Sequence, residues 1–250
     1  MSKLKNKVAV ITGGNSGIGL GIAQEFKNEG AKGAIVGRNQ KTLDSSVAQL
    51  GNNFIAINAD VTNVSDLEKV FKETFEKFGK IDVIVANAGA GTTGTVADLS
   101  EADYDKAMDL NLKSVYFTVN KALPYMNDGG SIVLIGSNAA HRAYPSFGLY
   151  GAAKAAVTYL AKAFSSDLLS RKIRANVITP GTTDTPAFEK FLPAEQIEAV
   201  KMHFAEQMPI GRIGQPSDIG KTAVFLASDD SSFMLGAELI VDGGMTYLSK

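Results

Sequence analysis

The chain of 250 residues contains no cysteine and only two histidines, His141 and His203. The lack of cysteine excludes a disulfide framework, a thiolate metal site and a cysteine nucleophile. Two histidines are too few for a His-rich site, so we expect no bound metal. No apolar run approaches the roughly 18 residues of a membrane-spanning helix, and the run after the N-terminal MSKLKNK is too short for a signal peptide. We therefore expect a soluble, cytoplasmic protein with no membrane partner.

The chain also lacks a large excess of charge of either sign, because its 25 Lys and Arg residues nearly balance its 26 Asp and Glu residues and leave a net charge of -1. The chain thus lacks the overall basic character of a nucleic-acid binder, and no nucleic-acid partner is expected. With 45% hydrophobic and 20% charged residues, the composition is that of a globular protein. No linker, charge block or repeat divides the sequence, so we predict a single domain over residues 1–250.

Short apolar runs alternate with segments of helical period along the whole chain. Most runs are continuously apolar, as strands buried on both faces of a parallel sheet require. Two helices between them are the clearest. The first carries an apolar stripe, expected to be buried, of Leu67, Val70, Phe71, Phe75 and Phe78, and the second runs from Ala152 to Leu169. This alternation predicts an α/β fold with a doubly wound parallel sheet of about seven strands flanked by helices. The runs are Val8–Ile11, Gly33–Val36, Phe54–Ile57, Ile81–Val85, Ile132–Ile135, Ala175–Ile178 and Leu239–Val241.

The segment from about residue 182 to 212 interrupts this alternation. It is rich in Thr and Pro around a short helical stretch, Ala194 to His203. A connection this long between sheet strands is usually a lid or a binding loop, and a solvated surface excursion is the alternative.

Glycines cluster directly after the first predicted strand, in the stretch Thr12 to Gly19, and a helix follows to about Gly30. Glycines let the chain turn tightly and let backbone amides approach a pyrophosphate at a helix N-terminus. Three residues separate Gly13 from Gly17, which differs from the usual G-x-G-x-x-G spacing. The position between strand and helix favours a dinucleotide loop over an ordinary β-α turn.

A second group of polar residues follows the fifth strand. Ser137 comes two residues after that strand, Tyr150 comes 13 residues later, and Lys154 follows Tyr150 by four. Residues four apart share a helix face, and a nearby ammonium favours the phenolate form of a tyrosine. A phenol so tuned can exchange a proton with a ketone or alcohol oxygen that Ser137 orients. The alternative is that these residues have no catalytic role: Tyr150 would then be an exposed residue beside Lys154, and Ser137 would only cap a turn.

Together these motifs resemble the short-chain dehydrogenase/reductase family over essentially the whole chain. Its T-G-x-x-x-G-x-G is matched by Thr12, Gly13, Gly17 and Gly19, and its N-A-G by Asn87, Ala88 and Gly89, with Ala86 replacing the first Asn of the commoner N-N-A-G. The resemblance implies a Rossmann-type fold, hydride transfer between a nicotinamide and a carbonyl carbon, and a homotetramer. The implied catalytic residues are Asn111, Ser137, Tyr150 and Lys154.

The resemblance also implies a set of cofactor-binding residues from several strand ends. Within it, Lys154 would bind the nicotinamide ribose, Asp60 and Val61 the adenine, and the Pro180 segment the carboxamide. The full set is Gly13, Asn15, Ser16, Gly17, Ile18, Gly19, Arg38, Asn39, Asp60, Val61, Asn87, Ala88, Gly89, Tyr150, Lys154, Pro180, Gly181, Thr183 and Thr185.

The end of the second strand bears on the choice of coenzyme. An NAD site usually has a carboxylate there, but this chain has none between Glu29 and Asp44 and carries Arg38 instead. Arg38 can pair with a 2′-phosphate, which favours NADP(H) as cofactor and leaves NAD(H) possible. Arg38 could instead stack on the adenine or lie in solvent.

The substrate is expected to be a fairly apolar small molecule, a ketone or a secondary alcohol, because aromatic residues surround the predicted site. A 3-oxoacyl carrier-protein reductase, a sugar or steroid dehydrogenase and a non-catalytic NADP-binding sensor remain alternatives. An enoyl reductase would need Tyr seven residues before Lys154, where Phe147 stands, and a serine hydrolase would need a G-x-S-x-G elbow at Ser137. The predicted substrate residues are Ser137, His141, Tyr144, Tyr150 and Phe188, with Arg142, Phe147 and Phe191 nearby.

Overall fold

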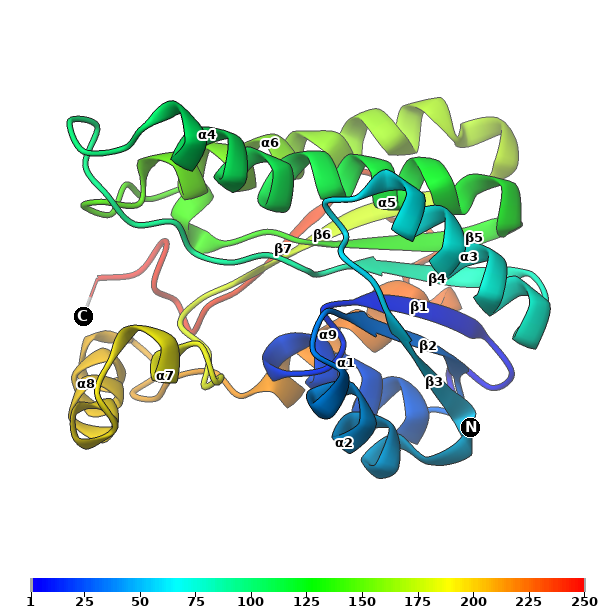
Figure 1. Ribbon diagram of the computed structural model, residues 1–250, viewed down its shortest axis with the longest axis horizontal. Helices are drawn as coiled ribbons and strands as arrows, with labels where there is room; N and C mark the ends of the chain where they lie inside the picture. The colour runs from blue at the N-terminus through cyan, green and yellow to red at the C-terminus, as the bar shows by residue number, and fades with distance from the viewer. Residues whose placement is uncertain (1, 250) are drawn as a thin grey trace.

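The computed structural model describes residues 2–249, with the backbone alone at residues 190 and 191. Its centre is one sheet of seven strands in the order β3-β2-β1-β4-β5-β6-β7 (Figure 1), and all neighbouring strands are parallel. Each predicted run lies within one strand, which confirms the predicted α/β parallel sheet. The strands are β1 Val8–Thr12, β2 Lys32–Gly37, β3 Phe54–Asn58, β4 Ile81–Ala86, β5 Met126–Ile135, β6 Arg174–Pro180 and β7 Glu238–Val241.

Helices cover both faces of this sheet (Figure 1). On one face pack α3, α5 and α6, and on the other α1, α2 and α9. The short α7 and the longer α8 lie in the predicted lid segment, and none of the described residues of α8 is buried. The helices are α1 Gly17–Asn28, α2 Gln40–Leu50, α3 Val64–Phe78, α4 Glu101–Met108, α5 Ser114–Ala122, α6 Gly148–Asp167, α7 Phe188–Phe191, α8 Ala194–Gln207 and α9 Pro216–Ala227. No helix within residues 2–249 has the length and apolar character needed to cross a bilayer.

Burial on both faces explains the continuous apolar strands. In β1, Val8 and Val10 belong to the hydrophobic core under α3, α5 and α6, whereas Ala9 and Ile11 belong to the core under α1, α2 and α9. Successive residues of a strand point to opposite faces. A central parallel strand therefore has no position at which a polar residue would reach solvent.

The strand order reverses beside β1, which pairs with both β2 and β4. The connections that follow these strands therefore diverge at the carboxyl edge of the sheet and leave a crevice between them. The loops after Thr12, Gly37, Ala86 and Ile135 all start at this edge, so the topology brings together motifs that are far apart in sequence.

Two elements differ from their sequence predictions. The helix α6 begins at Gly148, four residues before the predicted Ala152, so Tyr150 lies in its first turn. In α3, Phe75 is 38% exposed and contacts the Tyr125 ring, although the sequence placed it in the buried stripe. Thr74 takes the buried position instead, because its hydroxyl donates to the Val70 carbonyl at 2.8 Å and needs no solvent.

Candidate active site

A cavity of about 780 Å³ opens at the carboxyl edge of the sheet. Its wall combines the glycine loop, the ends of β2 to β6 and the start of α6. Thr183 is buried and does not line the cavity, and its hydroxyl donates to the Gly181 carbonyl at 3.0 Å. The predicted residues in the wall are Gly13, Asn15, Ser16, Gly17, Ile18, Gly19, Arg38, Asn39, Asp60, Val61, Asn87, Ala88, Gly89, Ser137, Tyr150, Lys154, Pro180, Gly181 and Thr185.

The glycine loop is tied to the segment after β4. The Thr12 hydroxyl accepts hydrogen bonds from the backbone amides of Asn87 and Ala88 at 3.0 and 3.1 Å. In return, the Asn87 side-chain amide donates to the Thr12 carbonyl at 2.9 Å. A Cβ on Gly19 would lie 2.2 Å from the Gly13 carbonyl oxygen, so only glycine allows the loop to close this tightly. The two motifs therefore form one rigid unit.

The amino end of α1 faces this unit and suits an anion. Ser16 precedes the helix without capping it through its side chain. The first amides of a helix lack intrahelical acceptors and carry the positive end of its dipole. Together with Gly13 and Gly17, which adopt φ of +63° and +50°, they form the kind of cradle that fits a pyrophosphate.

Arg38 and Asp60, which both line the cavity, lie side by side. The Arg38 guanidinium is 3.5 Å from the Asp60 carboxylate. Burial alone raises the pKa of Asp60, but hydrogen bonds from Thr62 and the Arg38 charge outweigh it, so the pKa lies below its ordinary value. Asp60 is thus a carboxylate near Arg38 in space, although the sequence shows none near Arg38 along the chain.

Ser137 and Tyr150 both line the cavity. Burial raises the pKa of Tyr150, and a hydrogen bond from the Ser137 hydroxyl lowers it in part. The shift of Tyr150 toward the phenolate that the Lys154 spacing predicts is not seen in the free protein, because the loss of hydration dominates. The Lys154 ammonium lies 5.7 Å from the centre of the Tyr150 ring.

Lys154 is buried with 3% exposure, and its ammonium donates to the Ile135 carbonyl at 2.9 Å. Burial lowers its pKa to about 8. A Cβ on Gly89 would lie 3.3 Å from this ammonium and 2.9 Å from the side-chain oxygen of Asn111. Gly89 thus leaves the space in which Lys154 and Asn111 come close to one another.

Asn111 occupies a π-helical turn, Asp109–Lys113, between α4 and α5. Its side-chain amide donates to the carbonyls of Ala90 and Ala107, both at 3.0 Å, and its oxygen accepts from the Ala90 amide at 3.1 Å. A π-helical turn changes the direction of one side chain within a helix and is frequent at functional sites. Here it turns Asn111 toward the segment after β4.

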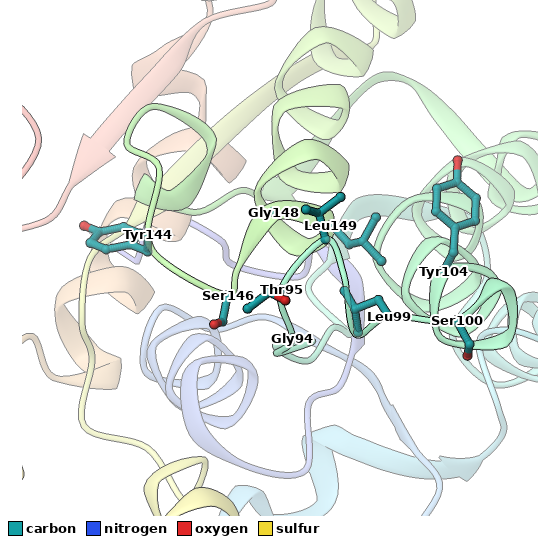
Figure 2. A pocket seen from close by; sticks show the side chains of 10 residues that line it. Gly94, Thr95, Leu99, Ser100, Tyr104, Tyr144, Ser146, Gly148 and Leu149 are labelled. Atoms are coloured by element: carbon teal, nitrogen blue, oxygen red, sulfur yellow. The ribbon is translucent and has the colours of Figure 1, made fainter.

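The remaining predicted substrate residues lie outside the wall of the large cavity. Tyr144 lines a second cavity of about 480 Å³, in which it lies across from Leu99 and Tyr104 (Figure 2). His141 binds Glu238, with 2.7 Å between Nε2 and Oε1, and the Phe188 ring packs against Phe204 in the lid. The side chain of Phe191 lies outside the described part of the chain.

Sequence reasoning missed most of the second cavity. Its wall includes Val96, Leu99 and Leu149, and Val96 and Leu99 come from the loop between β4 and α4. The signal in the sequence was the presence of these larger apolar residues in a loop made mostly of Gly, Ala and Thr. They match no motif, and only the fold brings them beside Leu149 at the start of α6.

Comparison with known proteins agrees with this geometry. Residues 13–246 match a family model described as "Enoyl-(Acyl carrier protein) reductase". The chain is 40% identical over 250 residues to "Oxidoreductase asL5" of Sarocladium schorii, covering 99% of each. It is 35% identical over 251 residues to an "NADP-dependent (R)-specific alcohol dehydrogenase" of Lentilactobacillus kefiri, covering 98% of each. The structure titled "Short-chain dehydrogenase/reductase SDR:Glucose/ribitol dehydrogenase from Brucella melitensis" aligns with a TM-score of 0.91 and 33% identity, covering 99% of each chain.

The chain belongs to the short-chain dehydrogenase/reductase family. This is a family of oxidoreductases that use NAD or NADP. Although the matched family model is described as an enoyl reductase, Tyr150 and Lys154 lie four residues apart on α6, not at the wider spacing expected of enoyl reductases.

The burial of Lys154 predicts an unusual pH dependence of stability. The pKa of Lys154 is about 8 in the folded protein, against a reference value of 10.5. Between these values only the unfolded chain holds the proton, so the free energy of unfolding should rise with pH, by up to about 3 kcal/mol. We expect wild-type protein to gain this stability relative to Lys154→Met between pH 8 and pH 10.5 in urea denaturation.

Lys221→Met, which removes a lysine from the exposed face of α9, is the control for loss of a charged side chain. A difference between wild type and Lys154→Met that stays constant over this pH range would contradict the assignment.

Proposed function

We propose that the protein is an NADP(H)-dependent oxidoreductase that interconverts a ketone and a secondary alcohol, with Tyr150 as general acid and base. The observation that carries this proposal is the shared cavity wall. Ser137, Tyr150 and Lys154 line the same 780 Å³ cavity as the glycine loop. A substrate oxygen beside Tyr150 would therefore lie next to the position that a dinucleotide takes, and one domain supplies both.

The wall residues fit a dinucleotide. The amides of the glycine loop and of α1 would hold the pyrophosphate, Lys154 the nicotinamide ribose, and Pro180, Gly181 and Thr185 the carboxamide. When bound, the nicotinamide supplies or accepts the hydride at its C4 atom, and the protein supplies orientation and electrostatics.

Tyr150 would transfer the proton. In the reducing direction its hydroxyl donates a proton to the ketone oxygen, and in the oxidising direction the phenolate takes one from the alcohol. The raised pKa of Tyr150 keeps it protonated near neutral pH, which suits reduction. Ser137 would donate a hydrogen bond to the same substrate oxygen, and Lys154 and Asn111 would pass the proton on toward solvent.

Replacing Tyr150 with Phe removes the proton donor and keeps the ring. We expect kcat to fall by about 10² to 10⁴-fold, while the Kd for NADPH, measured by fluorescence titration, changes little. Tyr159→Phe is the matched control, because Tyr159 lies on the same helix, does not line the cavity and keeps its ring in the variant. Tyr150→Phe with kcat near that of Tyr159→Phe would contradict the assigned role.

The preference for NADP(H) rests on Arg38, which is 70% exposed at the cavity wall. A guanidinium there can pair with a 2′-phosphate while Asp60 holds it on the other side. The relative from Lentilactobacillus kefiri is described as NADP-dependent, which supports the same assignment.

Arg38→Ala should weaken the binding of NADPH more than the binding of NADH. A hydrogen-bonded charge pair contributes about 1.5–3 kcal/mol, so KM for NADPH should rise by roughly 10 to 100-fold, with little change for NADH. Lys41→Ala, an exposed change on α2, should leave both values unchanged. A wild-type enzyme with higher kcat/KM for NADH than for NADPH would refute the coenzyme assignment.

The second cavity supports an apolar substrate. Val96, Leu99 and Leu149 contribute to its wall, and Leu149 directly precedes Tyr150. Such a wall favours a hydrophobic ketone over a sugar, which would need more hydrogen-bonding groups.

We also propose that the protein forms a homotetramer. Tyr104, Tyr116 and Tyr159 are 49%, 45% and 68% exposed on α4, α5 and α6, and Phe233 is fully exposed before β7. Large apolar side chains gathered on exposed helices are typical of association surfaces.

Light scattering at micromolar concentration should give about four times the chain mass of 26.4 kDa, and Tyr159→Arg should lower the measured mass. A monomeric mass for wild type would contradict the proposal.

A further inference from the structure

The carboxylate of Glu238, at the start of β7, contacts two different parts of the reaction site. Its Oε1 atom accepts a hydrogen bond from the Thr179 hydroxyl and lies 2.7 Å from His141 Nε2. Thr179 is fully buried in β6, directly before Pro180, and Glu238 keeps 19% side-chain exposure. One carboxylate oxygen thus joins the end of β6 to the loop after β5.

That loop carries the Ser137 hydroxyl. It starts with Gly136, whose amide donates to the Ile178 carbonyl at 2.8 Å and whose position has no room for a Cβ, which would lie 2.9 Å from the Thr179 hydroxyl. Ser137 follows, then a single helical turn, Asn138–Ala140, that ends at His141. The contact with Glu238 therefore lies four residues after Ser137, at the far end of this turn.

The two halves of the loop are held differently. Its first turn packs against α6, where a Cβ on Gly151 would lie 2.7 Å from the Ala139 carbonyl oxygen, and the Asn138 side-chain amide donates to the Tyr144 hydroxyl at 3.0 Å and contacts the Met245 sulfur at 3.4 Å. The second half is exposed at His141, Arg142, Ala143 and Pro145. A segment with few buried contacts depends on its hydrogen bonds for a fixed position.

We propose that Glu238 is a positioning residue for the reaction. By binding Thr179 and His141, it holds the loop from Ser137 to Tyr144 against β6. The Ser137 hydroxyl thereby keeps its hydrogen bond to Tyr150. The proposal rests on the proposed function of Tyr150 as acid and base. Glu238 and His141 are not catalytic themselves, because neither lines the cavity that contains Tyr150.

The consequence for chemistry follows from the Ser137–Tyr150 hydrogen bond, which lowers the pKa of Tyr150. If the loop shifts, this hydrogen bond weakens and the pKa rises. Oxidation of an alcohol needs the phenolate, so its rate would then increase only at a higher pH. A purely structural role of Glu238 would lower thermal stability without moving this pH profile.

The test uses Glu238→Leu, His141→Leu, the double variant and Glu238→Gln in the full-length protein. For alcohol oxidation, each Leu variant should lower kcat by about 10 to 100-fold, the cost of a small misplacement, and shift the kcat/KM profile to higher pH. The double variant should be no worse than Glu238→Leu alone, because Glu238→Leu already removes the contact that His141→Leu breaks. Glu238→Gln should keep kcat within threefold, since its amide oxygen still accepts both hydrogen bonds.

Asp128→Asn is the matched control, because Asp128 pairs with Arg171 at 2.8 Å at the opposite end of β5. It should leave kcat and the pH profile unchanged. Additive losses in the double variant, or Leu variants with wild-type kcat and an unchanged pH profile, would overturn the proposal. If Glu238→Leu fails to fold, kcat and the pH profile of His141→Leu and Glu238→Gln test the proposal in the same way. A wild-type enzyme that turns over no alcohol or ketone would instead refute the proposed function.

Discussion

The hydrogen bond from the Lys154 ammonium to the Ile135 carbonyl, 2.9 Å long, joins α6 to the end of β5, and the geometry of the reaction site depends on it. Tyr150 lies one helical turn before Lys154, and Ser137 lies two residues after Ile135. Fixing the helix to the strand at this point therefore places the phenol against the serine hydroxyl. The topology of the sheet makes the bond possible, since β5 ends at the same edge as the crevice beside β1.

Burial of Lys154 and Tyr150 has an electrostatic cost, and this cost shifts the pKa values on which proton transfer at the site depends. The Lys154 ammonium is removed from water, and no carboxylate of the described residues makes hydrogen-bonding contact with it, so its pKa is lowered to about 8. The same removal of water raises the pKa of Tyr150. A protonated phenol beside a readily titrated ammonium is well suited to proton exchange with a substrate oxygen. Functional sites commonly retain groups that destabilise the fold in this way.

Much of the fold could be predicted from the sequence because its determinants are local. A continuous apolar run such as Val8–Ile11 predicts a strand buried on both faces, and the structure places its residues in two separate cores. The meeting of the glycine loop with Asn87 followed from the parallel topology, which brings strand ends to one edge. Of the predicted cofactor residues, which all lie in the described part of the chain, Thr183 is the one that does not line the cavity.

What the sequence did not predict depends on contacts between distant elements. Asp60 reaches Arg38, and Glu238 reaches His141, through side-chain packing that no spacing rule describes. The direction of the Tyr150 pKa also escaped prediction, because a spacing of four residues indicates a nearby charge but not the depth of burial. The most direct test of the central claim is the pH dependence of kcat/KM for the wild-type enzyme in both reaction directions. If Tyr150 is both acid and base, ketone reduction should fall and alcohol oxidation should rise through one common pKa. Profiles that change in the same direction, or with unrelated midpoints, would contradict this account.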